Sequence, residues 1–140
     1  MPRIELDPDQ LLQVLSNLLR NAFQAMPDGG RLTLELAQVN DQGRVLPWLS
    51  VGVSDTGAGM DEETQSRLFE PFFSKREDGS GTGLGLSIVY GIVQEHGGKI
   101  FVTSRAGEGT RFDIYLPMEP EMRTHFEPKT ITYYSEKEHA

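Results

Sequence analysis

Apolar residues recur with a helical period in three stretches of the chain. From Asp9 to Met26 they fall three or four residues apart and so line one face of a helix. The residues of this face are Leu11, Leu15, Leu18, Ala22 and Ala25. A shorter helix with an acidic start is predicted from Asp61 to Leu68. A third, apolar helix is predicted from Leu84 to His96, where Gly97 and Gly98 end it.

Other segments alternate between apolar and polar residues, which is the period of a β-strand with one buried face. The strands predicted in this way are 32–36, 49–54, 100–103 and 112–116, with a further short strand at 4–6. Such strands form a sheet with one packed face, and three helices are available to cover that face. We therefore expect an α+β fold, a two-layer α/β sandwich whose mixed, mostly antiparallel sheet packs on three helices.

The last part of the chain has a different character. Residues 118–140 are charged and show no clear period, whereas residues 1–117 contain all the strong patterns. We expect residues 1–117 to form one domain and residues 118–140 to be a charged tail, a linker or a cloning remnant. Ile131 to Tyr134 is alternatively an edge strand of the sheet.

Composition narrows the classes of function. The 140 residues include 13 Lys and Arg against 21 Asp and Glu, a net charge of −8. A domain this acidic is a poor candidate for binding nucleic acid or an anionic membrane through its overall field. The chain has no cysteine, which excludes disulfides, cysteine-ligated zinc and thiol catalysis. Phosphate ligands held locally by backbone amides or a metal ion remain compatible with the charge.

Two polar residues interrupt the apolar phase of the predicted strands. Asp55 continues the inward set Leu49, Val51 and Val53, and Thr110 precedes an inward set in the last strand. A buried carboxylate is costly unless something pairs with it. In one interpretation both residues lie past the strand ends and cap loops. In the other they form a polar floor that hydrogen-bonds the edge of a flat ligand, with Asp55 accepting from an exocyclic amine.

The first predicted helix carries a second, polar stripe. Its members are Gln10, Gln13, Asn17, Asn21 and Gln24, with Arg20 beside them. The stripe is either a solvated face or a functional one. Asn is disfavoured inside helices, so two Asn spaced by four residues suggest a purpose. A neutral amide oxygen can ligate Mg²⁺ while phosphates supply the negative charge.

Residues 74–83 are polar and rich in glycine, and we expect a mobile loop there that leads into the third helix. The start of that helix can present N–H groups to an anion, or the glycines can form a simple hinge. No Lys follows the last glycine, so this is not a Walker A loop, and no strand precedes it as a dinucleotide fingerprint requires. Lys75 and Arg76 are either solvated or within reach of terminal phosphate oxygens.

The three histidines do not suggest a hydrolase. His96 stands at a predicted helix end, where it is expected to cap the helix, and His125 and His139 lie in the tail. None is part of a nucleophile–base pattern in the sequence, so Ser/His/Asp hydrolysis has no support.

Taken in order, these segments resemble the ATP-binding catalytic domain of sensor histidine kinases. That domain belongs to the gyrase-, Hsp90-, MutL- and histidine-kinase-type ATPases. The matching segments are the asparagine box at 17–22, the first glycine box at 55–60, the phenylalanine box at 68–73, the second glycine box at 81–86 and the strand start at 107–112. The resemblance covers about residues 4–117, and among these kinases it is closest to the nitrogen-regulation type.

The resemblance implies ATP and Mg²⁺ as cofactors and assigns roles to residues. Asn21 would ligate the metal, and Asp55 would bind the adenine amino group. The residues implied to contact the nucleotide are Asn17, Asn21, Asp55, Gly57, Gly59, Met60, Phe73, Gly81, Thr82, Gly83, Leu84, Gly85, Leu86 and Thr110. The implied catalytic residues are Asn21, Lys75 and Arg76, while Phe69, Phe72 and Phe73 would anchor a lid over the phosphates.

The resemblance also implies partners. The chain would present Mg-ATP for γ-phosphoryl transfer to a histidine on a separate dimerisation and phosphoacceptor domain, absent from this chain. A response regulator would be an indirect partner, and neither nucleic acid nor the membrane would be contacted. We expect a cytoplasmic location, with the alternative that the domain is part of a membrane-anchored receptor, and little autophosphorylation by this chain alone.

Two departures from the family pattern bear on the mechanism. ATP-hydrolysing relatives have a water-activating Glu four residues before the metal-binding Asn, where this chain has Asn17. An amide cannot act as a base, which favours transfer over hydrolysis. Many of the kinases also have a Lys or Arg where this chain has Gln24, so Arg20 or the lid must neutralise phosphate charge. The rival interpretations are a gyrase-type hydrolytic ATPase and a pseudo-kinase that senses nucleotide without transfer.

Overall fold

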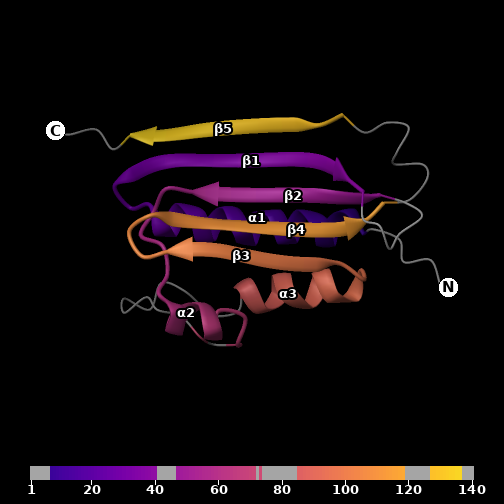
Figure 1. The fold of residues 1–140 in the computed structure, drawn as a ribbon, viewed down its shortest axis with the longest axis horizontal. Helices are drawn as coiled ribbons and strands as arrows, with labels where there is room; N and C mark the ends of the chain where they lie inside the picture. Colours follow the sequence, from indigo (N-terminus) through magenta and orange to yellow (C-terminus); the bar gives the residue numbers. More distant parts are fainter. Residues whose placement is uncertain (1–6, 41–46, 72, 74–84, 119–126, 137–140) are drawn as a thin grey trace.

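The computed structural model describes residues 7–40, 47–71, 73, 85–118 and 127–136. Within them the chain forms one five-stranded sheet and three helices (Figure 1). The strands are β1 (Gly29–Val39), β2 (Trp48–Asp55), β3 (Lys99–Arg105), β4 (Gly109–Pro117) and β5 (Lys129–Glu136). The helices are α1 (Pro8–Ala25), α2 (Glu62–Arg67) and α3 (Gly85–Glu95). The strand predicted at 4–6 lies outside the described residues.

The sheet has the order β3-β4-β2-β1-β5. Each of its four described strand pairings is antiparallel. Figure 1 shows α1 lying across one face of the sheet behind β2 and β4, and α3 beside β3. This arrangement confirms the predicted α+β fold, with helices and sheet in two layers. The sequence predicts a mixed sheet, whereas within the described residues it is wholly antiparallel, because each strand pairs with neighbours that run in the opposite direction.

The core lies between the helices and the inward faces of the strands. Buried residues of α1, among them Val14, Leu18 and Ala22, meet the inward set that the alternation predicts for β2 and β4. That inward set is Leu49, Val51, Val53, Phe112, Ile114 and Leu116. The sequence pattern therefore predicts correctly which face of each strand is packed.

The ends of the long helices are fixed by short-range hydrogen bonds. The Asp7 carboxylate accepts from the Asp9 amide at 2.9 Å, which caps α1 at its start. At the end of α3, His96 Nδ1 lies 2.8 Å from the Ile92 carbonyl and therefore donates to it. His96 Nε2 then accepts from the Asp7 amide at 3.4 Å. The expected capping role of His96 is confirmed, and its ring also ties α3 to the start of α1.

The predicted edge strand at Ile131 to Tyr134 is part of β5, which pairs with β1 over eight positions. The Tyr133 ring meets the Phe23 ring of α1 edge to face, with the ring centroids 5.9 Å apart. The side chains of residues 127–134 are all exposed. The strand therefore extends the sheet beyond the part that the helices cover.

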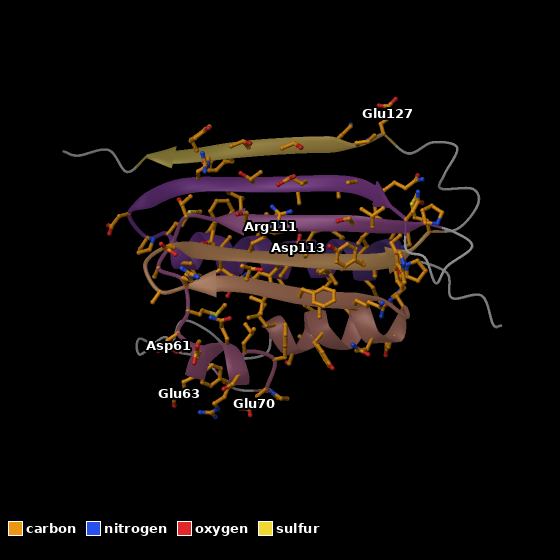
Figure 2. The ribbon with its side chains drawn as sticks, viewed as in Figure 1. Asp61, Glu63, Glu70, Arg111, Asp113 and Glu127 are labelled. Carbon is orange, nitrogen blue, oxygen red and sulfur yellow. The ribbon has the colours of Figure 1, made fainter. Side chains whose placement is uncertain are left out.

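The outer face of the sheet is polar where it crosses β1, β2 and β4. Arg111 donates to Glu35 at 2.8 Å and to Asp113 at 3.0 Å, and both acidic partners raise its pKa, Glu35 more strongly. Figure 2 shows Arg111 and Asp113 over the sheet, and Asp61, Glu63 and Glu70 projecting from the α2 region.

Among the described residues, no helix is long and apolar enough to cross a membrane.

Candidate functional site

Asp55 is the last residue of β2 and is only 6% exposed. Its Oδ1 atom accepts from the Gly57 amide at 2.9 Å and from the Thr110 amide at 3.2 Å. In the described part of the chain, Oδ2 accepts no hydrogen bond. One carboxylate oxygen therefore caps the loop, as the first interpretation expected. The other is buried and left for a donor from elsewhere.

The electrostatics of Asp55 follow from this geometry. Burial raises the pKa of the carboxyl, and the bonds from Gly57 and Thr110 oppose that rise without cancelling it. A hydrogen bond from an N–H group to the unused, buried oxygen of this carboxylate is therefore favourable. This is the property that the polar-floor interpretation requires.

Thr110 lies directly opposite Asp55 in the β2–β4 register and is 5% exposed. Its hydroxyl is 2.9 Å from the hydroxyl of Ser104 on β3. Ser104 also donates to the Gly109 carbonyl at 3.0 Å. The structure thus brings Asp55 and Thr110 together, although 54 residues lie between them in the sequence.

The segment from Gly57 to Met60 turns tightly against the ends of α1 and β3. Ala58 donates to the Ala25 carbonyl at 3.1 Å, and Gly107 donates to the Ala58 carbonyl at 2.6 Å. Gly59 has a φ of 69°, and a Cβ there would collide with the Arg105 carbonyl oxygen. The first glycine box therefore needs glycine at position 59 for both its backbone conformation and its close packing.

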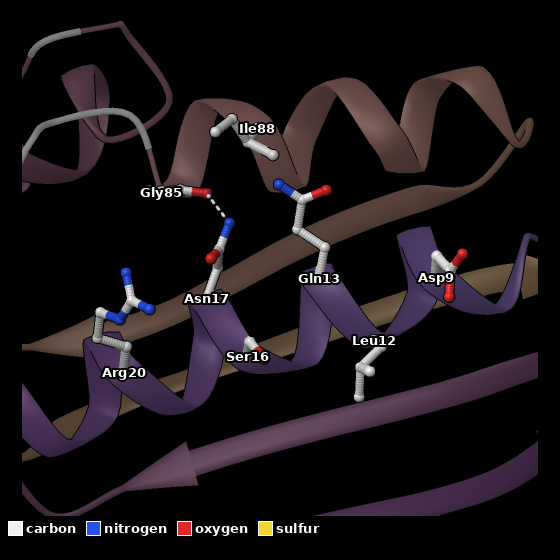
Figure 3. A pocket seen from close by; sticks show the side chains of 8 residues that line it. All are labelled: Asp9, Leu12, Gln13, Ser16, Asn17, Arg20, Gly85 and Ile88. Atoms are coloured by element: carbon white, nitrogen blue, oxygen red, sulfur yellow. Dashed lines mark hydrogen bonds between the residues drawn. The ribbon is translucent and has the colours of Figure 1, made fainter.

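The polar stripe of α1 contributes two asparagines with different surroundings. Asn17 Nδ2 donates to the Gly85 carbonyl at 3.2 Å, which joins the asparagine box to the first residue of α3 (Figure 3). Asn21 is half-buried, and within the described residues its amide makes no hydrogen bond. Asn17 thus positions the end of the second glycine box, while the Asn21 amide remains available for a ligand.

A groove of about 540 Å³ lies between α1 and α3 and contains both asparagine-box and glycine-box atoms. Its lining residues are Asp9, Leu12, Gln13, Ser16, Asn17, Arg20, Gly85 and Ile88. Figure 3 shows Gln13, Asn17 and Arg20 in succession along α1, with Ile88 opposite on α3. The groove therefore combines a cation, amides and an apolar wall.

The phenylalanine box contacts the neighbouring helices. Phe69 packs on Tyr90 of α3 with ring centroids 5.2 Å apart. The Arg67 guanidinium lies 4.5 Å from the centre of the Phe73 ring. Leu86, from the second glycine box, packs against the core. The predicted site residues Lys75, Arg76, Gly81, Thr82, Gly83 and Leu84, together with Phe72, lie outside the described residues.

Sequence reasoning missed two residues at this site. Ser104 follows Ile100 and Val102 in the inward phase of β3, so the strand alternation contains the signal that would have found it. No comparable pattern in the sequence singles out Gln65. It lies on α2, where its side chain donates to the carbonyls of Met60 and Ser104 at 2.8 and 3.1 Å. Only the folded chain brings these groups together.

The described residues contain no group of three or more His, Cys, Asp or Glu side chains that could hold a metal ion. The half-buried Asn21 amide fits a divalent cation bound by anionic ligands, because its oxygen is neutral and adds no repulsion between them.

A family model described as "Histidine kinase-, DNA gyrase B-, and HSP90-like ATPase" matches residues 6–120. The chain belongs to this ATPase family. The matched segment contains Asp55, Thr110, both asparagines of α1 and the glycine boxes, and it ends before β5. The resemblance seen in the sequence is thereby confirmed.

Three curated relatives that match this chain are named as kinases. Sporulation kinase E of Bacillus subtilis (strain 168) is 44% identical over 118 residues, 84% of this chain and 15% of that protein. ZraS of Klebsiella oxytoca is 43% identical over 121 residues, 86% of this chain and 25% of the relative. NtrB of the same species, named as a sensory histidine kinase/phosphatase, is 43% identical over 123 residues, 84% and 34% of the two chains.

Solved structures agree with these relatives. A mycobacterial sensor histidine kinase, MprB, superposes with a TM-score of 0.68 at 31% identity, covering 80% of this chain and 72% of that chain. Full-length ShkA in complex with AMPPNP gives a TM-score of 0.64 at 31% identity, and the match covers 84% of this chain and 23% of that chain. The chain is thus an ATP-binding catalytic domain of the sensor histidine kinase type. It spans about a third or less of the length of the three relatives described.

Proposed function

We propose that this domain binds Mg-ATP and presents the γ-phosphoryl group to a histidine on a separate dimerisation and phosphoacceptor domain. The observation that carries the proposal is Asp55, a buried carboxylate with one oxygen capped by the backbone and the other unused within the described residues. Its unused oxygen accepts from the exocyclic amine of adenine, and Thr110 and Gly59 line the base.

The phosphate end of the nucleotide lies toward the polar stripe of α1. Asn21 supplies an amide oxygen to Mg²⁺, which when bound neutralises charge on the phosphate oxygens. Arg20, in the groove beside Asn17, is a cation within the same stripe. Lys75 and Arg76, with the glycines of the second box, complete the phosphate site in this proposal.

The groove between α1 and α3 supplies the place where the acceptor domain approaches. Leu12 is 63% exposed and Ile88 36%, so its wall offers apolar side chains to a helix that carries the acceptor histidine. Asn17 and Gly85 form one end of the groove, next to the proposed phosphate site. Phosphoryl transfer requires mainly that the two reactants be held in line, which this placement serves.

Transfer is favoured over hydrolysis by the residues around Asn17. Its amide nitrogen is engaged by Gly85, and an amide does not deprotonate water. Among the described residues that line the groove, the one carboxylate is that of Asp9, eight residues earlier on α1, about 12 Å along the helix axis. In this proposal the domain works in the cytoplasm, where ATP is available. A response regulator then receives the phosphoryl group from the acceptor domain.

The test uses γ-labelled ATP with Mg²⁺ and a panel of histidine-acceptor domains. We expect the chain alone to bind ATP without forming phosphohistidine, and acid-labile label to appear on a cognate acceptor domain when it is added. Asp55→Asn should weaken ATP about 10–100-fold, the effect of one hydrogen bond to a charged group.

Three results would contradict the proposal. Steady phosphate release by the chain alone would indicate a hydrolytic ATPase. ATP binding without transfer to any acceptor domain would indicate a nucleotide-sensing module. Labelled phosphohistidine on the isolated chain would show that the acceptor lies within it.

A further inference from the structure

The peptide groups on both sides of Met60 are held by side chains from two other elements. The Met60 amide donates to Ser104 Oγ on β3 at 2.8 Å. The Met60 carbonyl accepts from Gln65 Nε2 on α2 at 2.8 Å, and the same Nε2 donates to the Ser104 carbonyl at 3.1 Å. Gln65 and Ser104 therefore close a small network around the last residue of the first glycine box.

This network continues to the proposed base-binding residues. Ser104 Oγ has a single proton, and donation to the Gly109 carbonyl at 3.0 Å uses it. The Thr110 hydroxyl, 2.9 Å away, then donates to Ser104. Thr110 in turn donates its amide to Asp55 Oδ1 at 3.2 Å. Hydrogen bonds, joined by the covalent bonds within Ser104 and Thr110, thus link Gln65 to Asp55.

Gln65 is the α2 member of this network, and its amide joins that helix to β3 and to the glycine loop. It is half-buried, so water competes less for its amide than at an exposed position. A carboxamide suits the place because one NH₂ group serves two carbonyl oxygens. A carboxylate of the same shape has no donor and would face two acceptors.

We propose that Gln65, acting with Ser104, is a positioning residue for adenine recognition. It holds the Gly57–Met60 loop so that the unused oxygen of Asp55 meets the amine of the base. This inference rests on the proposed function, because it assumes that Asp55 binds adenine. Gln65 itself contacts neither nucleotide nor metal.

The experiment compares ATP with inosine triphosphate (ITP), whose base has a carbonyl in place of the amine. Both affinities are measured by calorimetry for the wild-type chain and for Gln65→Leu, Gln65→Glu and Ser104→Ala. Gln94→Glu makes the same change at an exposed position of α3 and is the matched control. The ratio of the two affinities does not depend on the fraction of chain that is folded.

We expect Gln65→Leu and Gln65→Glu to lower ATP affinity about fivefold to tenfold, the effect of one or two neutral hydrogen bonds. ITP affinity should change less than about twofold, because the carbonyl at position 6 of its base cannot donate to Asp55. Ser104→Ala should have a similar effect and combine less than additively with Gln65→Leu. Gln94→Glu should leave both affinities unchanged.

An unchanged preference for ATP over ITP in the Gln65 variants would overturn the inference, as would an equal loss of both affinities. Asp55→Asn is the reference for the proposed function and should abolish the preference. If Asp55→Asn abolishes it and the Gln65 variants do not, the positioning role alone is wrong. A wild-type chain that binds the two nucleotides alike would overturn the adenine site and this inference together.

Discussion

Asp55 shows how one residue can be unfavourable for the fold and useful for binding. Its carboxylate lies at the end of the apolar, inward face of β2 and is only 6% exposed. Two backbone N–H groups donate to one of its oxygens. Asparagine would keep an acceptor for those two bonds without the cost of burying a charge. The proposed binding role of the charged form accounts for an aspartate at this position despite that cost.

The pH dependence of Asp55 follows from its raised pKa. The folded chain binds this proton more tightly than the unfolded chain, whose carboxyl has a pKa near 3.8. The stability that protonated Asp55 contributes is therefore present below 3.8 and is lost as the pH rises through the folded-state pKa. In the proposed site, ATP affinity instead decreases as the pH falls, because a proton on the unused oxygen of Asp55 blocks the acceptor for the adenine amine.

We therefore expect ATP affinity to begin to fall at a higher pH, as the solution is acidified from neutral, than it would for an aspartate with an ordinary pKa. Asp55→Asn should lose this dependence and, without nucleotide at neutral pH, should be at least as stable as the wild type. Calorimetry across the pH range and urea unfolding measure the two effects. Lower stability of Asp55→Asn at neutral pH would mean that the charge stabilises the fold.

At the scale of elements, the site depends on how loops join helices to the sheet. The Gly57–Met60 loop touches α1 through Ala25, β3 through Ser104 and α2 through Gln65. Asn17 likewise joins α1 to the start of α3. The helices therefore position the ends of the two glycine boxes through single hydrogen bonds as well as through the core.

A pair of glycine substitutions tests the loop. Gly59→Ala should destabilise the chain by roughly 2–4 kcal/mol, since it combines a left-handed backbone with a clash against the Arg105 carbonyl. Gly91→Ala, inside α3 with open space around it, should stabilise by about 0.5–1 kcal/mol. Chemical denaturation measures both. Similar effects at the two positions would show that the loop tolerates another conformation.

For the molecule as a whole, β5 raises the question of where the domain ends. All eight of its residues pair with β1, yet its described side chains are exposed and it lies beyond the family match. Tyr133 of β5 pairs with Leu32 of β1, and Leu32 pairs with Asp55 of β2. One strand therefore lies between β5 and Asp55. The domain boundary predicted near residue 117 therefore stays a prediction that truncation can test.

A chain ended after Pro120 should fold and bind ATP within about twofold of the full chain, because β5 does not touch the proposed site. It should unfold about 5 °C lower, because the edge of β1 and Phe23 lose their cover. Calorimetric titration and thermal unfolding test the two statements. Loss of ATP binding by a folded truncated chain would assign β5 to the catalytic domain.

The sequence alone predicted the helices and strands well, because their signals are local. The period of Leu11 to Ala25 defines α1, and the alternation in β2 and β4 gives the correct inward faces. The same parity singled out Asp55 and Thr110 before any partner was known. Spacing within the boxes was enough to indicate the family, since each box keeps its chemistry within six consecutive residues.

The tertiary structure decided the pairings that no local pattern contains. Register placed Asp55 opposite Thr110 and left one carboxylate oxygen unused, and packing of α2 brought Gln65 to Met60 and Ser104. The structure also shows that Ile131 to Tyr134 form part of an edge strand, the alternative to a tail in the sequence analysis. These outcomes depend on contacts between distant segments, whose energies arise only when the whole sheet and its helices form together.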